Sequence, residues 1–167
     1  MEASTYLRPS WDEYFLGLME EVGKRATCDR GRSGCIVVRG KQIVCTGYVG
    51  SPPGFPHCDD EGHLLKQVVE EDGSSRMHCM RAIHAEQNAI CQAAKHGISL
   101  ERCTLFCKME PCRVCAMLII SVGITKVVAQ KNTMLPRTPG KCSSRPGWNW
   151  WWLSRKSNSI RFSDHPP

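Results

Sequence analysis

The sequence lacks any apolar run long enough to form a membrane-spanning helix. It also lacks the layout of a secretory signal peptide, since Met1-Glu2-Ala3-Ser4 has no basic start followed by an apolar stretch. These absences argue against a membrane protein and a secreted protein, and we expect a cytoplasmic location. Disulfides are rare in that compartment, so most of the 11 cysteines are expected to be reduced thiols or metal ligands.

Net charge is also lacking over most of the chain, although the total is +6. Residues 131–167 hold seven Lys or Arg against one acidic residue, whereas residues 1–130 hold 15 of each sign. A neutral body lacks the basic surface that long nucleic acid requires, so we expect no such partner. At 167 residues without an internal repeat, the chain is most simply one folded domain.

Hydrophobic periodicity predicts helices and strands in alternation. A first helix is predicted from Ser10, an N-cap with Glu13 three residues on, to about Ala26. Further helices are predicted over residues 84–96 and from Pro111 to Gly123. Short apolar runs predict strands at residues 35–38, 43–46, 104–107 and 126–129. Residues 55–78 are polar and are interpreted as a mostly irregular lid or insertion. This alternation predicts an α/β layer fold with a mixed sheet.

One pattern indicates chemistry: His84-Ala85-Glu86, followed downstream by Pro111-Cys112-Arg113-Val114-Cys115. One imidazole and two thiols are zinc ligands, and three protein ligands leave a fourth position open, as in catalytic sites. A His-x-Glu followed by Pro-Cys-x-x-Cys is a known signature of zinc-dependent nucleobase deaminases. Both motifs open predicted helices, so we expect two helix N-termini, whose partial positive charge favours thiolate, to meet at one ion.

Glu86 is interpreted as a proton carrier and not as a metal ligand. A carboxylate beside zinc-activated water can move its proton to a ring nitrogen and then to a departing amine. The alternative is a closed structural zinc site or a reduced cysteine pair, which a lone Cys-x-x-Cys in a cysteine-rich chain would suggest. The complete set of residues favours a catalytic zinc.

Residues 10 to about 131 resemble the deoxycytidylate (dCMP) deaminase family, within the cytidine deaminase-like fold. The resemblance rests on Ala26-Thr27-Cys28, Gly47-Tyr48-Val49-Gly50, Pro52, Gly54, Pro56-His57-Cys58, the two zinc motifs, Gln87-Asn88-Ala89-Ile90 and Gly123-Ile124. It implies a three-layer α/β/α sandwich with a mixed five-stranded sheet, usually as a homo-oligomer. It also implies conversion of the small nucleotide dCMP to dUMP for thymidylate synthesis. In that reaction Zn²⁺ is held by His84, Cys112 and Cys115, and Glu86 is the proton shuttle.

Several other residues are candidates for binding. The candidates for binding the substrate are Arg32, Tyr48, Ser51 and Asn88. The candidates for binding its phosphate are the basic residues Lys24, Arg25, Arg30 and Arg32. The alternative for this basic run is a solvated helix end. Val49 stands where the family has Asn, so an amide that can bond the nucleotide is missing. Some family members carry a second, structural zinc, for which the candidates here are Cys28, Cys58, His78 and Cys79. The alternative is that Cys28 and Cys79 are simply small buried side chains.

The tail, residues 132–167, departs from the family pattern. It holds four of the five Trp and five of the ten Pro, without helical or strand periodicity. Trp has a single codon, so Trp150-Trp151-Trp152 is TGG TGG TGG, and reading one base earlier yields GTG GTG, which encodes Val-Val. With suitable synonymous codons, the segment from Asn132 reads YHAAEDSGKMFKQAGVELVVV, an amphipathic helix, a glycine stop and a strand.

We therefore interpret residues 1–131 as a zinc-dependent deaminase domain and residues 132–167 as an irregular, frame-shifted tail. In this interpretation the last helix and strand of the family are missing or altered. The alternative is a genuine basic, aromatic tail that binds nucleic acid or a membrane surface.

The leading functional prediction is hydrolytic deamination of dCMP to dUMP and ammonia by zinc-activated water. Within the same chemistry, the alternative is deamination of another base, such as adenosine in transfer RNA, guanine or cytidine. From a different class, the alternative is a non-catalytic, zinc-stabilised nucleotide-binding protein.

Overall fold

A mixed sheet with the strand order β2-β1-β5-β6-β7 forms the centre of the computed structural model, which describes residues 7–69, 73–131 and 159–161. β1 (Gly34–Arg39) pairs antiparallel with β2 (Gln42–Tyr48) and with β5 (Thr104–Met109). β6 (Lys126–Lys131) lies parallel to β5. Four strands carry the sheet, and β7 (Ser159–Arg161) adds only three residues along β6. The predicted count of five strands is therefore not matched in full.

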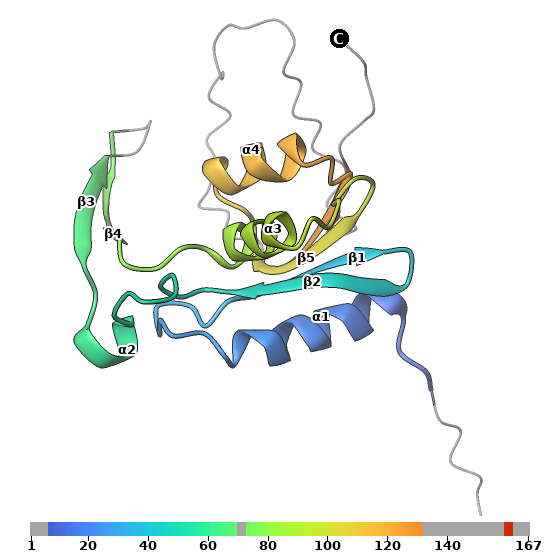
Figure 1. Ribbon diagram of the computed structural model, residues 1–167, viewed down its shortest axis with the longest axis horizontal. Helices are drawn as coiled ribbons and strands as arrows, with labels where there is room; N and C mark the ends of the chain where they lie inside the picture. The colour runs from blue at the N-terminus through green and yellow to red at the C-terminus, as the bar shows by residue number, and fades with distance from the viewer. Residues whose placement is uncertain (1–6, 70–72, 132–158, 162–167) are drawn as a thin grey trace, which may run out of the picture.

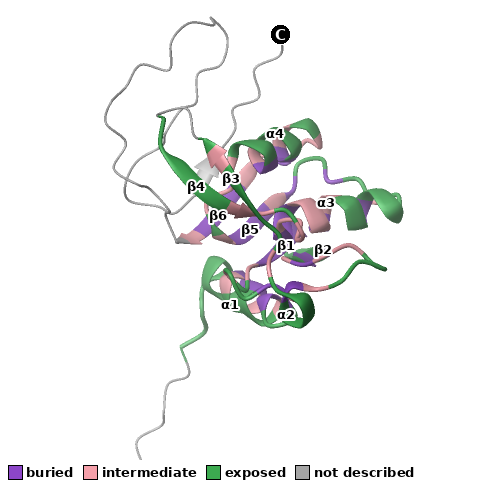
Figure 2. Ribbon diagram, turned by 90° about the vertical axis from the view of Figure 1, so that its left-hand side faces the viewer, coloured by how far each residue is buried: buried purple, intermediate pink, exposed green. Residues whose placement is uncertain are grey.

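Helices cover both faces of this sheet, as Figure 1 shows. α1 (Trp11–Gly23) lies on one face, and α3 (Ala85–Lys95) and α4 (Arg113–Ser121) lie on the other. β1 alternates between the two layers: Ile36 packs in the cluster beneath α1, and Val37 packs in the larger cluster beneath α3 and α4. The predicted α/β/α layering is confirmed, with the buried residues between the layers (Figure 2).

The start of α1 follows the predicted capping box. The hydroxyl of Ser10 accepts a hydrogen bond from the backbone N–H of Glu13 at 3.3 Å, and the Glu13 carboxylate accepts one from the backbone N–H of Ser10 at 2.8 Å. Each bond satisfies an N–H group that the helix itself leaves unpaired. The helix ends at Gly23, three residues before the predicted end.

α3 approaches β2 at Gly47. A Cβ atom added at Gly47 would lie 2.3 Å from the Ala85 carbonyl oxygen and 2.5 Å from the Ala89 backbone nitrogen. Only glycine permits this approach, and the small buried Ala85 and Ala89 complete it from the helix side. The contact fixes the N-terminus of α3 beside the end of β2, where the His-x-Glu motif lies.

Residues 55–78 are not mostly irregular, which corrects the prediction. They hold α2 (Cys58–Glu61) and most of an antiparallel hairpin of β3 (Leu65–Val69) and β4 (Ser75–Cys79), a separate two-stranded sheet. Their sequences, LKQVV and SRMHC, lack the alternation of apolar and polar residues that reveals a strand. The hairpin projects from the body in Figure 1 and is largely exposed in Figure 2.

Beyond Lys131 the structure describes only the backbone of β7, which pairs antiparallel with β6. The remaining predictions for the tail fall on residues 132–158 and 162–167, which lie outside the described residues. Within the described ranges, no helix has the length and apolar character to cross a membrane. The cytoplasmic location stays a prediction. All ten described cysteines are free thiols, as expected.

Candidate active site and metal centres

Two helix starts bring His84, Cys112 and Cys115 together. His84 is the N-cap of α3, Cys112 is the N-cap of α4, and Cys115 follows one turn into α4, where it is fully buried. The Nδ1 atom of His84 lies 3.5 Å from the Cys112 sulfur and 3.3 Å from the Cys115 sulfur. The sequence predicted this meeting of two helix N-termini, and the three donor atoms lie within 4.8 Å of one another.

These distances suit a zinc ion. Tetrahedral coordination with Zn–S of ~2.3 Å and Zn–N of ~2.0 Å places nitrogen and sulfur ligands roughly 3.5 Å apart. The spacing between His84 and the two sulfur atoms agrees with that value. Imidazole and thiolate together are a donor set that zinc prefers over harder cations. Three ligands leave one corner of the tetrahedron for water or substrate.

The two thiols of this cluster differ strongly in pKa. The pKa of Cys112 is lowered to about 3, first by its hydrogen bond with Cys115 and then by its bond with His84, and the same pairing raises the pKa of Cys115. The hydrogen bond with Cys112 also raises the pKa of His84. Cys112 is therefore the thiolate of the pair, at the positive end of a helix dipole, where an anionic ligand is favoured.

Glu86 lies beside this cluster without being one of its three members. It is the only polar or charged side chain in the buried class among the described residues, with 8% of its surface exposed. Its Oε2 atom lies 3.9 Å from the Cys115 sulfur. Burial raises the pKa of the Glu86 carboxyl above its usual value. A carboxyl group in this environment can hold and release a proton nearer to neutral pH.

A second cluster joins Cys28, Cys58, His63 and Cys79, whose donor atoms also lie within 4.8 Å of one another. The sulfur atoms of Cys58 and Cys79 are 3.6 Å apart, and the Cys28 sulfur is 3.9 Å from Nδ1 of His63. Four ligands of this kind make up a closed, structural zinc site. The segments that supply them are the loop after α1, α2, the α2–β3 connection and β4.

The fourth member of this cluster is His63 and not the predicted His78, which is a correction. Successive residues of a strand point to opposite sides, so β4 directs Cys79 into this cluster and His78 away from it. Nε2 of His63 lies 2.9 Å from a carboxylate oxygen of Asp29. A carboxylate on the far nitrogen orients a metal-ligating histidine. Nothing in the local sequence singled out His63, since its role depends on how the chain folds back at α2.

Two of the candidate substrate-binding residues, Arg32 and Asn88, are hydrogen-bonded within the chain. The guanidinium of Arg32 donates to both oxygens of Asp59, at 2.6 and 2.9 Å, and to the Ala26 carbonyl, so it braces the loop after α1. Nδ2 of Asn88 donates to the Tyr48 carbonyl at 2.6 Å, which ties α3 to the end of β2.

Ser51 differs from these bracing residues. Its hydroxyl is buried without a hydrogen-bond partner among the described residues, so it can form a hydrogen bond with a ligand. Of the other basic residues before β1, Lys24 pairs with Glu21 at 2.7 Å and Arg30 donates to the Met77 carbonyl at 2.8 Å.

Comparison with known proteins identifies relatives. A sequence model described as the cytidine and deoxycytidylate deaminase zinc-binding region matches residues 9–131. The deoxycytidylate deaminase of Mycobacterium phage D29 is 36% identical over 129 residues, covering 75% of this chain and 98% of the relative. The crystal structure of a dCMP deaminase from the cyanophage S-TIM5, in complex with dCMP and dUMP, matches with a TM-score of 0.57 and 31% identity. That match covers 76% of this chain and 85% of the other.

Some relatives are much longer than this chain. The deoxycytidylate deaminase of Schizosaccharomyces pombe is 35% identical over 121 residues, which cover 72% of this chain but only 37% of the relative. This chain therefore spans less than half the length of that curated relative. The family model's match over residues 9–131 includes both zinc motifs of this chain.

Proposed function

Because this chain belongs to the cytidine and deoxycytidylate deaminase family, we propose that it catalyses the hydrolytic deamination of dCMP to dUMP and ammonia. The observation that carries the proposal is the buried carboxyl of Glu86 beside the cluster of His84, Cys112 and Cys115. The choice of dCMP is supported by the cyanophage relative, whose structure contains dCMP and dUMP.

In this proposal His84, Cys112 and Cys115 hold one Zn²⁺. When bound at a site with an open position, zinc lowers the pKa of water towards 7. The water oxygen bonds to C4 while Glu86 takes one water proton and delivers it to the ring nitrogen next to C4. Glu86 then takes the remaining hydroxyl proton and passes it to the departing amine. The C4–N bond breaks, and dCMP and water become dUMP and ammonia. The raised pKa of Glu86 suits it to both halves of this transfer.

The test is ammonia release by the zinc-loaded full chain with dCMP, CMP, dCTP and cytidine assayed side by side. We expect the highest kcat/KM with dCMP, and loss of turnover in His84→Ala together with loss of one bound zinc. Preference for cytidine, or for a base of another kind, would replace the substrate while keeping the chemistry. Bound zinc and nucleotide affinity without any turnover would instead favour a non-catalytic nucleotide-binding protein.

We also propose a structural zinc at Cys28, Cys58, His63 and Cys79. It would join four segments around the hairpin, which otherwise has little apolar surface to hold it. Metal analysis of the purified chain is expected to find two zinc ions per chain. Cys58→Ser and His63→Ala should each lower the count to one and reduce thermal stability. His78→Ala is the matched control and should keep both ions; a loss there would return His78 to the ligand set.

A further inference from the structure

The hairpin of β3 and β4 has one basic face. Residues directly opposite each other in an antiparallel pair project to the same side of the sheet. Lys66 lies opposite His78, and Val68 lies opposite Arg76. Residues two apart in a strand also share a side. Lys66, Arg76 and His78 therefore project from the same face, and neither strand contains an acidic residue. We call this set the basic face.

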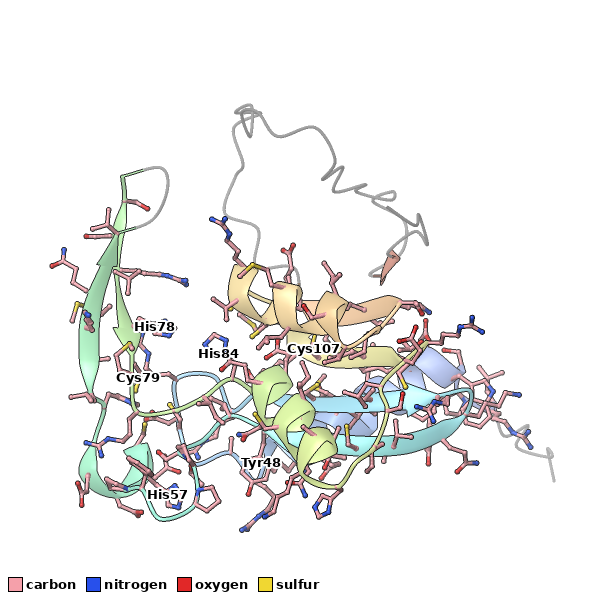
Figure 3. All side chains as sticks on the ribbon, turned by 45° about the horizontal axis from the view of Figure 1, so that its top comes forward. Tyr48, His57, His78, Cys79, His84 and Cys107 are labelled. Carbon is pink, nitrogen blue, oxygen red and sulfur yellow. The ribbon has the colours of Figure 1, made fainter. Side chains whose placement is uncertain are left out.

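The His78 end of the basic face lies beside the candidate active site. The ring of His78 lies 5.6 Å from the ring of His84, measured between centroids. Figure 3 shows His78 projecting from β4 towards His84. Arg76 lies two residues farther along β4, which is ~7 Å at the usual rise of a strand. The basic face thus runs outward from the position of the catalytic metal.

Within the two described strands, the charged side chains lie only on this side of the hairpin. The opposite face carries uncharged residues: Leu65, Gln67, Val69, Ser75, Met77 and Cys79. Charges that only protect strand edges from aggregation have no reason to avoid one face. The one-sided placement instead suits a ligand of negative charge on this face of the hairpin.

A further cation lies close by. Arg30 donates to the Met77 carbonyl at 2.8 Å, so its guanidinium is held at β4. In sequence, residues 65–79 hold Lys66 and Arg76 against Glu70, Glu71 and Asp72, so the positive charge belongs to this face of the two described strands and not to the hairpin as a whole. Residues 70–72 lie outside the described residues.

We propose that the basic face binds the 5′-phosphate of the nucleotide whose base lies at the cluster of His84, Cys112 and Cys115. This inference rests on the proposed function, and it assigns the preference for a nucleotide over a nucleoside to the hairpin. Base and phosphate are at opposite ends of the substrate, which matches a face that runs outward from the metal. The planar guanidinium of Arg76 can bond two phosphate oxygens at once, and Lys66 adds a second positive charge.

The test compares the binding of dUMP and deoxyuridine to the zinc-loaded full chain by isothermal titration calorimetry. These ligands differ only in the phosphate, and their binding requires no turnover. Arg76→Ala and Lys66→Ala should each weaken dUMP binding about tenfold, the effect of losing one charge-assisted hydrogen bond, and deoxyuridine binding less than about twofold. Arg76→Lys should recover part of the loss. Lys95→Ala removes the same charge from the exposed last turn of α3 and serves as the control.

Equal losses for dUMP and deoxyuridine would overturn the assignment, because the hairpin would then act only through its structure. Unchanged dUMP affinity, or an equal loss in Lys95→Ala, would overturn it as well. Failure of the proposed reaction looks different. If the chain releases no ammonia from dCMP, yet Arg76→Ala weakens the binding of dUMP and not of deoxyuridine, the proposed phosphate site stands and the proposed deaminase activity is wrong.

Discussion

At the scale of single residues, burial gives Glu86 its chemical character. The carboxyl lies in the first turn of α3, 8% exposed and 3.9 Å from the Cys115 sulfur. Removal from water disfavours the charged form, so the protein holds a proton there that an exposed carboxyl would lose. The same burial that suits the residue for proton transfer carries a cost in stability once the group ionises.

Glu86→Gln should separate these two effects. The amide cannot transfer protons, so kcat with dCMP should fall by about 10²–10⁴-fold while zinc content stays unchanged. In the metal-free protein, the pKa of Glu86 is higher in the folded state than its ordinary value of about 4.5. The unfolding free energy of the wild type should therefore fall relative to that of the variant as pH rises from about 4.5 through the folded-state pKa. Kinetics and thermal melts at several pH values would check both; a pH-independent difference between the two proteins would contradict the second.

At the scale of elements, the site depends on how closely α3 lies on β2. Gly47 has no side chain to hold the helix away, and Ala85 and Ala89 face it. The helix start carries His84, and the side chain of Asn88 is bonded to the Tyr48 carbonyl at the end of β2. A small shift of α3 would therefore move one of the proposed zinc ligands relative to the two supplied by α4.

Gly47→Ala should test this coupling. The added Cβ would lie 2.3 Å from the Ala85 carbonyl oxygen, and such overpacking costs ~1–3 kcal/mol of unfolding free energy. Zinc affinity should fall as well, because His84 moves with the helix. Gly17→Ala is the control. A Cβ atom added at Gly17, on the exposed side of α1, has no atom within 4 Å apart from its nearest neighbours along the helix. This substitution should stabilise the protein by about 0.5–1 kcal/mol. Denaturation curves and zinc titrations of both variants give the answer; unaltered zinc affinity in Gly47→Ala would disprove the coupling.

At the scale of the whole molecule, α4 has apolar residues on its outer side. Val114, Met117 and Leu118 are 51%, 48% and 37% exposed, although α4 also packs Cys115 and Ile119 against the sheet. A helix that is apolar all round is normally covered on both sides. The sequence from Asn132, read one base earlier, would supply an amphipathic helix and a strand at this point of the chain.

A chain that carries YHAAEDSGKMFKQAGVELVVV from Asn132 onward should therefore be more stable than the present one. Covering the exposed parts of the three α4 side chains would contribute roughly 1–3 kcal/mol. Calorimetric melts of the two chains test this difference in stability. Met117→Lys, made in both chains, should destabilise the chain with the replaced tail more, because Met117 would be covered there. An equal effect in both would contradict it. Sequencing the gene tests the frame shift itself, because an incompatible codon choice would exclude the alternative reading.

Self-association also belongs to this scale and stays a prediction. The outer side of α4 is a surface through which a second copy of the chain could bury apolar area. Light scattering of the full chain is expected to give a mass above the 18.7 kDa of one chain. Met117→Glu should then shift the distribution to smaller species. A monomer at all concentrations would rule out the expected homo-oligomer.

Prediction from the sequence succeeded where the deciding interactions are local. The order of helices and strands follows from periodicity, and the Ser10 capping box follows from residues three apart. Cys112 and Cys115 are separated by about one helical turn, so the sequence alone predicts that they lie close together. By contrast, the hairpin gave no periodic signal, because its short strands bury neither face of the pair in an apolar core.

The amino-acid sequence alone determined which groups can do chemistry here: one imidazole, two thiols and a carboxyl at the starts of two helices. Tertiary structure decided which groups meet across long separations. It placed His63 and not His78 with Cys28, Cys58 and Cys79. It also put Lys66, Arg76 and His78 on one face of the hairpin, with the ring of His78 5.6 Å from that of His84. The reason is physical: spacing within a helix fixes local neighbours, whereas contacts between distant segments depend on packing and on the side of a strand that faces inward.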